Sequence, residues 1–180
     1  MKLKSILMAT AIMMLTTCGL IAQNSKTLVM YFSWGGTTEK MAKMISSSNG
    51  GEFFRIEPTK SYPTSYTPCT EVVKEELDNG IFRQVKKAPD FSKYDTIFVG
   101  VPVWWHTAPT LMTHFLEENK EALKGKTIIP FCTYQATYRA ETLQAIVDAT
   151  PTASHKEGYG TTNPNQNDVD AWLKKIGVAK

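Results

Sequence analysis

Two glycine-rich phosphate-binding patterns are missing from this sequence of 180 residues. It has no Gly-x-x-x-x-Gly-Lys-Ser/Thr, which holds a nucleoside triphosphate with magnesium, and no Gly-x-Gly-x-x-Gly, which holds the pyrophosphate of a dinucleotide. Its three histidines have no cysteine, histidine or aspartate neighbours at metal-ligand spacing. These absences argue against a triphosphate, a dinucleotide and a metal ion as ligands.

A block of basic residues is also missing. The net charge of +3 includes Lys2 and Lys4, so a chain that starts at Gln23 carries about +1. Nucleic acids and anionic membrane surfaces attract concentrated positive charge. Neither is therefore expected as a partner.

The first 22 residues differ from the rest of the chain. Lys2 and Lys4 precede an apolar run over 6–15, which is too short for a membrane span, and Ala22 offers a small residue at a cleavage point. This pattern predicts a signal peptide over 1–22 and an exported, periplasmic protein. A second interpretation is a lipoprotein signal, because Leu15-Thr-Thr-Cys18 resembles a lipobox, and Cys18 would then carry a lipid anchor.

The remaining residues, 23–180, have the length of one ordinary domain. No internal repeat or low-complexity linker interrupts them. Export would place Cys69 and Cys132 where disulfides are permitted. The sequence leaves open whether these two thiols are oxidised, since it does not place their Cβ atoms.

A strand, a loop and a helix are predicted over 27–45. Leu28 to Phe32 is continuously apolar, as in a strand buried on both faces of a parallel sheet, and Met41, Met44 and Ile45 recur at helical spacing. The loop between them holds hydroxyls and glycines at the positive end of the helix dipole. It suits a single phosphate monoester, although an ordinary glycine turn has the same appearance.

Apolar β segments and amphipathic helices then alternate along the chain. Strands are expected at 53–56, 96–99 and 127–132, and a fifth lies near 153–159. Helices are expected after Thr67, with Pro68 at the first helical position and Gly80 as the stop, after Pro109 through Leu123, and around 140–147 and 169–176. The alternation predicts a three-layer, doubly wound parallel α/β sheet that binds ligands at the carboxyl ends of its strands.

Two further loops at that edge carry aromatic residues. After the third strand, Trp104, Trp105 and His106 follow Pro102, and after the fourth strand come Thr133, Tyr134 and Tyr138. Aromatic side chains outside a strand offer flat surface for a planar ring, although a tryptophan more often packs into a core. His106 is a candidate proton donor or simply a solvated side chain.

These segments resemble the flavodoxin-like family, in the subfamily whose third-strand loop reads Gly-x-Pro-x-Trp-Trp. The matches are Tyr31-Phe-Ser-Trp-Gly-Gly-Thr-Thr38, Asp95-Thr-Ile-Phe-Val-Gly-Val-Pro-Val-Trp-Trp105 and Gly125-Lys-Thr-Ile-Ile-Pro-Phe-Cys-Thr133. The resemblance implies a five-stranded sheet of order 2-1-3-4-5 and non-covalently bound FMN. The residues it assigns to FMN are Ser33, Trp34, Gly35, Gly36, Thr37, Thr38, Pro102, Val103, Trp104, Trp105, His106, Thr133, Tyr134 and Tyr138.

One segment departs from that subfamily. Its fourth-strand loop commonly continues as His-Gly-Gly-Ser-Gly, whereas this chain has Tyr134-Gln-Ala-Thr-Tyr138, with no glycine. Glycines there would let backbone N–H groups approach the flavin closely. Their absence bears on the geometry and affinity of flavin binding.

Three classes of function stay open on the sequence. The first is an FMN-dependent oxidoreductase, such as a quinone reductase using NAD(P)H, and the second is an electron carrier that docks onto a redox partner protein. The third is a binding module that keeps the fold and has lost the flavin. Catalytic side chains are not required in the first two, because the flavin carries the chemistry. Export favours a partner protein or a quinone over nicotinamide nucleotides.

Overall fold

The computed structural model describes residues 26–135 and 137–179. The predicted signal peptide and Cys18 lie outside the described residues, so they stay predictions.

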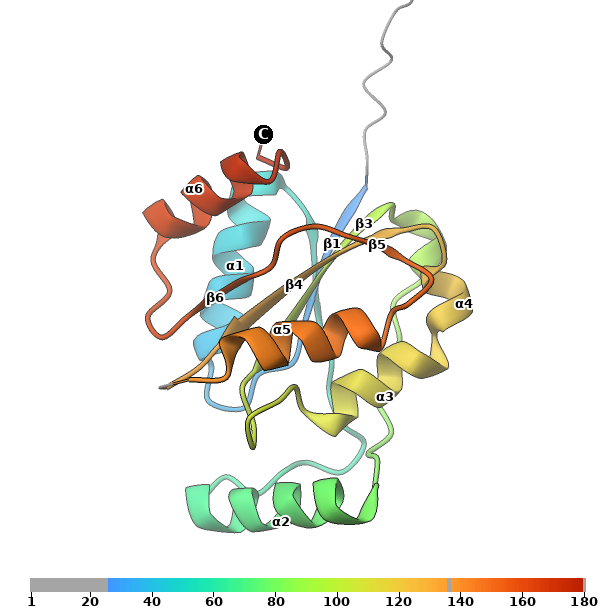
Figure 1. Ribbon diagram of the computed structural model, residues 1–180, viewed down its shortest axis with the longest axis vertical. Helices are drawn as coiled ribbons and strands as arrows, with labels where there is room; N and C mark the ends of the chain where they lie inside the picture. Colours follow the sequence, from blue (N-terminus) through green and yellow to red (C-terminus); the bar gives the residue numbers. More distant parts are fainter. Residues whose placement is uncertain (1–25, 136, 180) are drawn as a thin grey trace, which may run out of the picture.

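A parallel sheet forms the centre of the molecule (Figure 1). Its strands are β1 (Thr27–Tyr31), β2 (Glu52–Arg55), β3 (Thr96–Pro102), β4 (Thr127–Thr133), β5 (Ser154–His155) and β6 (Tyr159–Thr161). They pair in the order β2-β1-β3-β4-β5, with β6 also on β4, and every pairing within the sheet is parallel. The predicted order 2-1-3-4-5 is confirmed.

The fifth strand differs from the expectation, because two short strands share its place. β5 pairs with Thr127 and Ile128, β6 pairs with Phe131 onward, and Pro130 lies between these contacts. Ile128 accepts a hydrogen bond from Lys156 on this side, and Pro130, two residues on, has no N–H to give to the same side. The break in the edge strand therefore falls where β4 offers no donor.

Helices cover both faces of the sheet (Figure 1). On one face lie α1 (Thr37–Asn49) and α6 (Gln166–Lys175), and on the other lie α3 (Thr110–Glu118), α4 (Lys120–Leu123) and α5 (Arg139–Asp148). The second face also takes buried residues from α2 (Tyr66–Asn79) and from a 3-10 turn, Phe91–Lys93. This is the predicted three-layer arrangement.

Alternate residues of each central strand supply the two cores. In β3, Ile97 and Val99 pack with α3 and α5, whereas Phe98 packs with α1 and α6. All three side chains are fully buried, so the strand reads as a continuous apolar run. A parallel sheet covered on both faces requires this pattern.

The helix boundaries agree only in part with the predicted ones. Helix α2 begins at Tyr66, so Pro68 is its third residue, still within the first turn where no intrahelical N–H bond is needed. The helix after Pro109 breaks at Asn119, which ends α3 and begins α4. Gly80 ends α2 as predicted, in a left-handed conformation with φ 62°.

Both described cysteines are buried free thiols. Cys69 belongs to α2 and Cys132 to β4. The structure therefore has no bridge between them.

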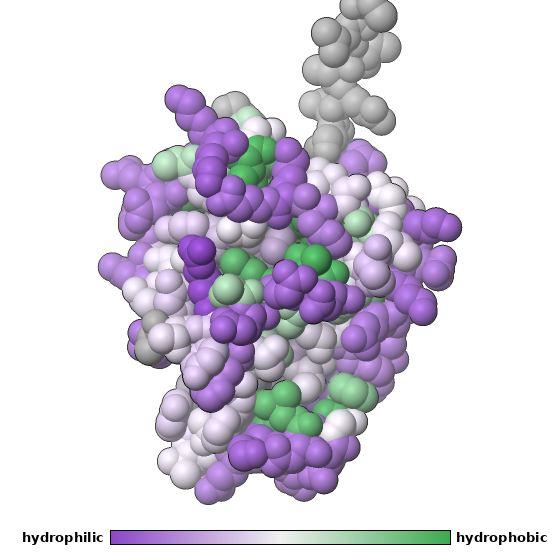
Figure 2. All heavy atoms as spheres, viewed as in Figure 1, coloured by the Kyte–Doolittle hydropathy of each residue, from purple (hydrophilic) through white to green (hydrophobic). Residues whose placement is uncertain are grey.

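One face of the molecule is mostly hydrophilic. Figure 2 shows hydrophilic residues over most of the visible face, with apolar residues in small separate patches. None of the helices in the described ranges is long and apolar enough to span a bilayer.

Substituting Gly100 tests the packing between β3 and β4. A Cβ at Gly100 would lie 2.0 Å from Cζ of Phe131, so Gly100→Ala should lower the free energy of unfolding by about 1–3 kcal/mol. A Cβ at Gly35 meets no atom within 4 Å, so Gly35→Ala is the matched control and should stay within about 0.5 kcal/mol of the parent. Urea unfolding measures both, and equal stabilities would contradict this packing.

Candidate functional site

A cavity of ≈ 710 Å³ lies at the carboxyl edge of the sheet. Small-molecule sites usually have volumes of about 300–1,000 Å³, so this cavity is of ordinary size for one. The loops after β1, β3 and β4 form three of its sides, and α2 forms the fourth. Its lining residues are Ser33, Trp34, Gly35, Thr37, Thr38, Tyr66, Cys69, Thr70, Val73, Pro102, Val103, Trp104, Trp105, His106, Thr133, Tyr134, Gln135, Thr137 and Tyr138.

The loop after β1 turns tightly into α1. Ser33 Oγ accepts a hydrogen bond of 3.1 Å from Gly36 N–H, and Gly36 adopts φ 88°, which glycine tolerates best. The first intrahelical bond runs from Lys40 N–H to Gly36 O, so the N–H groups of Thr37 and Thr38 have no acceptor within the helix. These N–H groups and the Ser33 hydroxyl give this end of the cavity the donors that an anion requires.

A hydroxyl pair joins this loop to β4. Thr38 Oγ1 and Thr133 Oγ1 lie 2.8 Å apart, and both side chains are buried. One hydroxyl donates to the other, which leaves one hydroxyl hydrogen of the pair for a ligand. The pair fixes the distance between the first and third loops.

A two-residue turn ends the loop after β3. Trp104 and Thr107 exchange both backbone hydrogen bonds, at 2.9 and 3.1 Å. The central residues, Trp105 and His106, have φ of 45° and 70°, as a type I′ turn requires. Such turns favour Asn-Gly, so Trp-His is strained here and must be held by its surroundings.

Contacts on both sides hold this turn. Trp105 Nε1 donates to Thr70 O in α2 at 2.9 Å, and Lys74 Nζ lies 5.5 Å from the Trp105 ring. On the other side, the His106 and Tyr138 rings stack at 3.8 Å between centroids. His106 is therefore an exposed side chain whose ring stacks on the ring of Tyr138.

Tyr138 is itself left-handed, with φ 66°. It occupies the last position of the stretch where the related subfamily commonly has glycine. Trp105, His106 and Tyr138 are the only non-glycine residues with positive φ in the described ranges, and all three line this cavity. Strain concentrated at one cavity is typical of a functional site.

Trp104 is backed by a buried aromatic and ionic cluster. Its ring meets Phe32 and Tyr62 edge-on, with centroids 5.2 and 4.8 Å apart. Tyr62 O–H donates to Glu76 at 2.9 Å, and Arg83 Nε donates to the same carboxylate at 2.5 Å. This cluster ties the 58–65 segment and α2 to the tryptophan wall.

Thirteen of the fourteen residues predicted for a ligand site line the cavity. Gly36 does not line it and instead precedes α1 as its N-cap. Sequence reasoning missed the wall from α2, which consists of Tyr66, Cys69, Thr70 and Val73. The only sequence signal for that wall was the helical spacing of Cys69 and Val73, which also describes an ordinary core face.

The described lining of the cavity contains no acidic side chain. None of its lining residues in the described ranges is Asp or Glu, and those ranges hold no cluster of His, Cys, Asp or Glu suited to a metal ion. Burial raises the pKa of the Cys69 thiol, so this cysteine is a protonated lining group rather than a nucleophile.

The fold and the site together define a doubly wound α/β protein with a donor-rich turn and an aromatic cleft at one edge of its sheet. Within that class, the chain belongs to the flavodoxin family, whose sequence model, described as Flavodoxin, matches residues 26–176.

Solved structures agree with this assignment. A candidate flavoprotein from Bacteroides eggerthii is 29% identical with a TM-score of 0.74, covering 86% of this chain and 99% of its own. Another from Bacteroides uniformis is 28% identical with a TM-score of 0.71, covering 83% and 98%. A Lactobacillus acidophilus flavoprotein in complex with FMN shares the fold, at 20% identity and a TM-score of 0.71, covering 85% and 99%. No protein of curated function matches the chain.

Alkaline unfolding tests the cluster behind Trp104. Burial and the neighbouring Glu76 raise the pKa of Tyr62, and burial raises those of Tyr31, Tyr94 and Cys132 to about 12. In the unfolded chain these groups lose their protons near the ordinary pKa values of 9 to 10. Their contribution to the free energy of unfolding is therefore complete below pH 9 and decreases as the pH rises above that range. Tyr62→Phe should reduce this slope by up to about 1.4 kcal/mol per pH unit above pH 10.

Urea unfolding at pH 8–11 measures the slope. Tyr62→Phe should also lose about 1–3 kcal/mol at pH 8, because Glu76 loses a donor. Tyr66→Phe removes a hydroxyl from a ring that is 74% exposed and should leave the stability at pH 8 unchanged. An unaltered alkaline slope in Tyr62→Phe would rule out the buried, protonated tyrosine.

Proposed function

We propose that this protein binds FMN non-covalently in the 710 Å³ cavity and transfers electrons through it. The observation that carries the proposal is the pairing of an anion-binding turn with an aromatic cleft in one cavity of a flavodoxin-family chain. FMN presents the same two chemical features, a phosphate monoester at one end and a flat ring system at the other.

The residues around the turn fit a phosphate. Ser33 has a hydroxyl hydrogen to donate, the Thr38 and Thr133 pair has another, and the N–H groups of Thr37 and Thr38 point out of the helix end. A dianion would gain charge-assisted hydrogen bonds together with the favourable helix dipole.

The aromatic loops fit the ring system. Trp104 is held edge-on by Phe32 and Tyr62, while Trp105 and Tyr138 are partly exposed on the cavity wall. Pro102 and Val103 add apolar surface between them. The stacked rings of His106 and Tyr138 close one side of the cleft. A bound flavin ring would have to fit beside them.

Bound FMN supplies the redox chemistry, and the protein supplies the cavity, the orientation and the electrostatic surroundings. The proposal includes export, based on the signal pattern in residues 1–22. An exported protein would exchange electrons with a partner protein or a quinone. Turnover with NAD(P)H and a quinone would indicate an oxidoreductase. Reduction by a partner protein alone would indicate an electron carrier.

Comparing FMN with riboflavin tests the phosphate turn. Each charge-assisted bond is worth about 1.5–3 kcal/mol, so riboflavin should bind at least about a hundredfold more weakly than FMN. The double change Ser33→Ala with Thr38→Ala should weaken FMN strongly and hardly alter riboflavin binding. Calorimetric titration of the purified protein measures both ligands.

Thr113→Ala provides the control for losing a hydroxyl outside the site, because the Thr113 hydroxyl donates to Thr110 O within α3. It should leave both affinities unchanged. Equal affinities of the unaltered protein for FMN and riboflavin would show that the loop after β1 is only a turn.

The flavin potential tests the charge of the cavity. Because none of the described residues that line it is acidic, fully reduced anionic flavin should meet little repulsion, and its potential should be mild. Thr137→Glu should make the potential more negative, by an interaction on the order of 1 kcal/mol. Thr113→Glu in α3, away from the cavity, should not. A strongly negative potential in the unaltered protein, measured by potentiometry, would refute the charge argument.

A further inference from the structure

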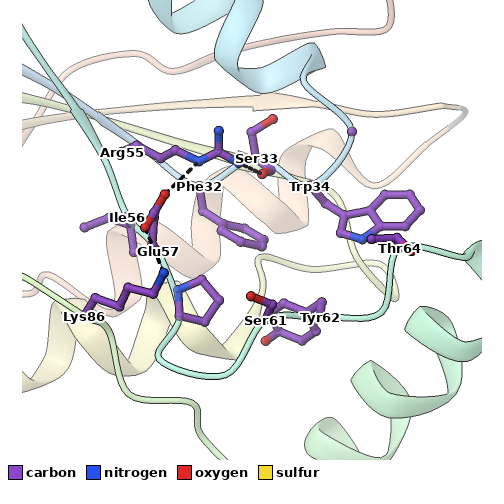
Figure 3. Close-up of a pocket in the computed structure, with 12 residues that line it drawn as sticks. Phe32, Ser33, Trp34, Arg55, Ile56, Glu57, Ser61, Tyr62, Thr64 and Lys86 are labelled. Carbon is purple, nitrogen blue, oxygen red and sulfur yellow. Dashed lines mark hydrogen bonds and ion pairs between the residues drawn. The ribbon is translucent and has the colours of Figure 1, made fainter.

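A second cavity of ≈ 450 Å³ adjoins the proposed flavin cavity (Figure 3). The two share Ser33, Trp34 and Gly35 as a common wall. The end of β2, the 58–64 segment and Lys86 form its other sides. Its volume falls within the range of small-molecule sites, and FMN binding as proposed above does not use it.

Trp34 supplies a flat surface to this cavity. Its Nε1 donates to Pro63 O at 2.8 Å, which fixes the indole, and its side chain is 36% exposed. The other three tryptophans all contact aromatic rings, whereas within the described ranges no ring or cation packs on Trp34. Phe32 and Tyr62 continue the apolar lining beside it. Such a surface suits a planar apolar ligand.

Charged side chains gather at the opposite end. Figure 3 shows Arg55, Glu57 and Lys86 together there, with Phe32 between them and Trp34. Of the residues that line this end, Arg55 and Lys86 are cations and Glu57 is a carboxylate, and Arg55 also pairs with Glu39 outside the lining. An anion at this end therefore depends on Lys86.

The two cations differ in how fully they are engaged. Arg55 donates to Ser33 O and to Glu39, both at 3.1 Å, and lies 3.9 Å from Glu57. Lys86 Nζ has one bond, to Glu57 at 3.1 Å, in a pair that is about half exposed. Such an exposed ion pair contributes little to the stability of the fold, and it leaves ammonium hydrogens of Lys86 free to bond a ligand.

The backbone also holds Lys86 in place. Its N–H donates to Glu57 O at 2.8 Å, and the preceding Val85 forms an antiparallel bridge with Pro58. The ammonium group therefore extends from an anchored segment rather than from a free loop.

We propose that this second cavity binds a flat aromatic molecule carrying one anionic group, such as an aromatic monocarboxylate. The ring lies against Trp34 and the anion lies at Lys86. The site shares the wall formed by Ser33, Trp34 and Gly35 with the proposed flavin site, and it does not require the flavin.

Calorimetry with 2-naphthoate tests the proposal. The chain starting at Gln23 is first saturated with FMN, so that the larger cavity is filled, and is then titrated with 2-naphthoate and with uncharged 2-naphthamide. Lys86→Met should weaken 2-naphthoate about threefold to tenfold while FMN uptake and 2-naphthamide affinity stay unchanged. Lys87→Met removes the same charge from the next, exposed residue, which does not line the cavity, and should change neither ligand.

Two results would overturn the proposal. One is no binding of 2-naphthoate at concentrations up to about 10 mM. The other is an equal effect of Lys86→Met and Lys87→Met, which would indicate general charge attraction. If the protein takes up no FMN, the proposed function fails, and the same comparison of the two lysine variants on the flavin-free protein still decides the second cavity.

Discussion

The constraint on which this molecule depends is the burial of a parallel sheet on both faces. Strands β1, β3 and β4 lie side by side and point the same way, so the loops that follow them must emerge together at one edge. Helices cover the two faces, which leaves this edge as the place where irregular backbone and polar groups gather. The cavity lies there for that reason.

Rigidity at this edge comes from contacts between loops rather than within them. The hydroxyls of Thr38 and Thr133 join the first and third loops, and the rings of His106 and Tyr138 join the second and third. The left-handed Trp105 is bonded to Thr70 in α2. Strained conformations persist where several elements fix them at once. Here the loops after β1, β3 and β4 and helix α2 are joined by these contacts.

The stretch between β2 and β3 has a larger role than its irregular sequence indicates. Tyr62, Glu76 and Arg83 form a buried cluster that supports Trp104. In the same stretch, Pro63 O accepts the hydrogen bond that holds Trp34 on the wall shared by the two cavities. A buried carboxylate is tolerated because a tyrosine hydroxyl and a guanidinium both donate to it. The cluster thus links the proposed ring-binding surface to α2.

The sequence by itself determined the local elements and the loops that matter. Continuous apolar strands, helical spacing and the turn from Ser33 to Thr38 depend on neighbours along the chain, and the family resemblance supplied the strand order. Only the tertiary structure decided that α2 forms one side of the cavity and that the edge strand breaks beside Pro130. It also decided that Cys69 and Cys132 are not bridged, and that Tyr138 takes a left-handed conformation against His106. These features depend on contacts between residues far apart in the chain, and local propensity carries no information about such contacts.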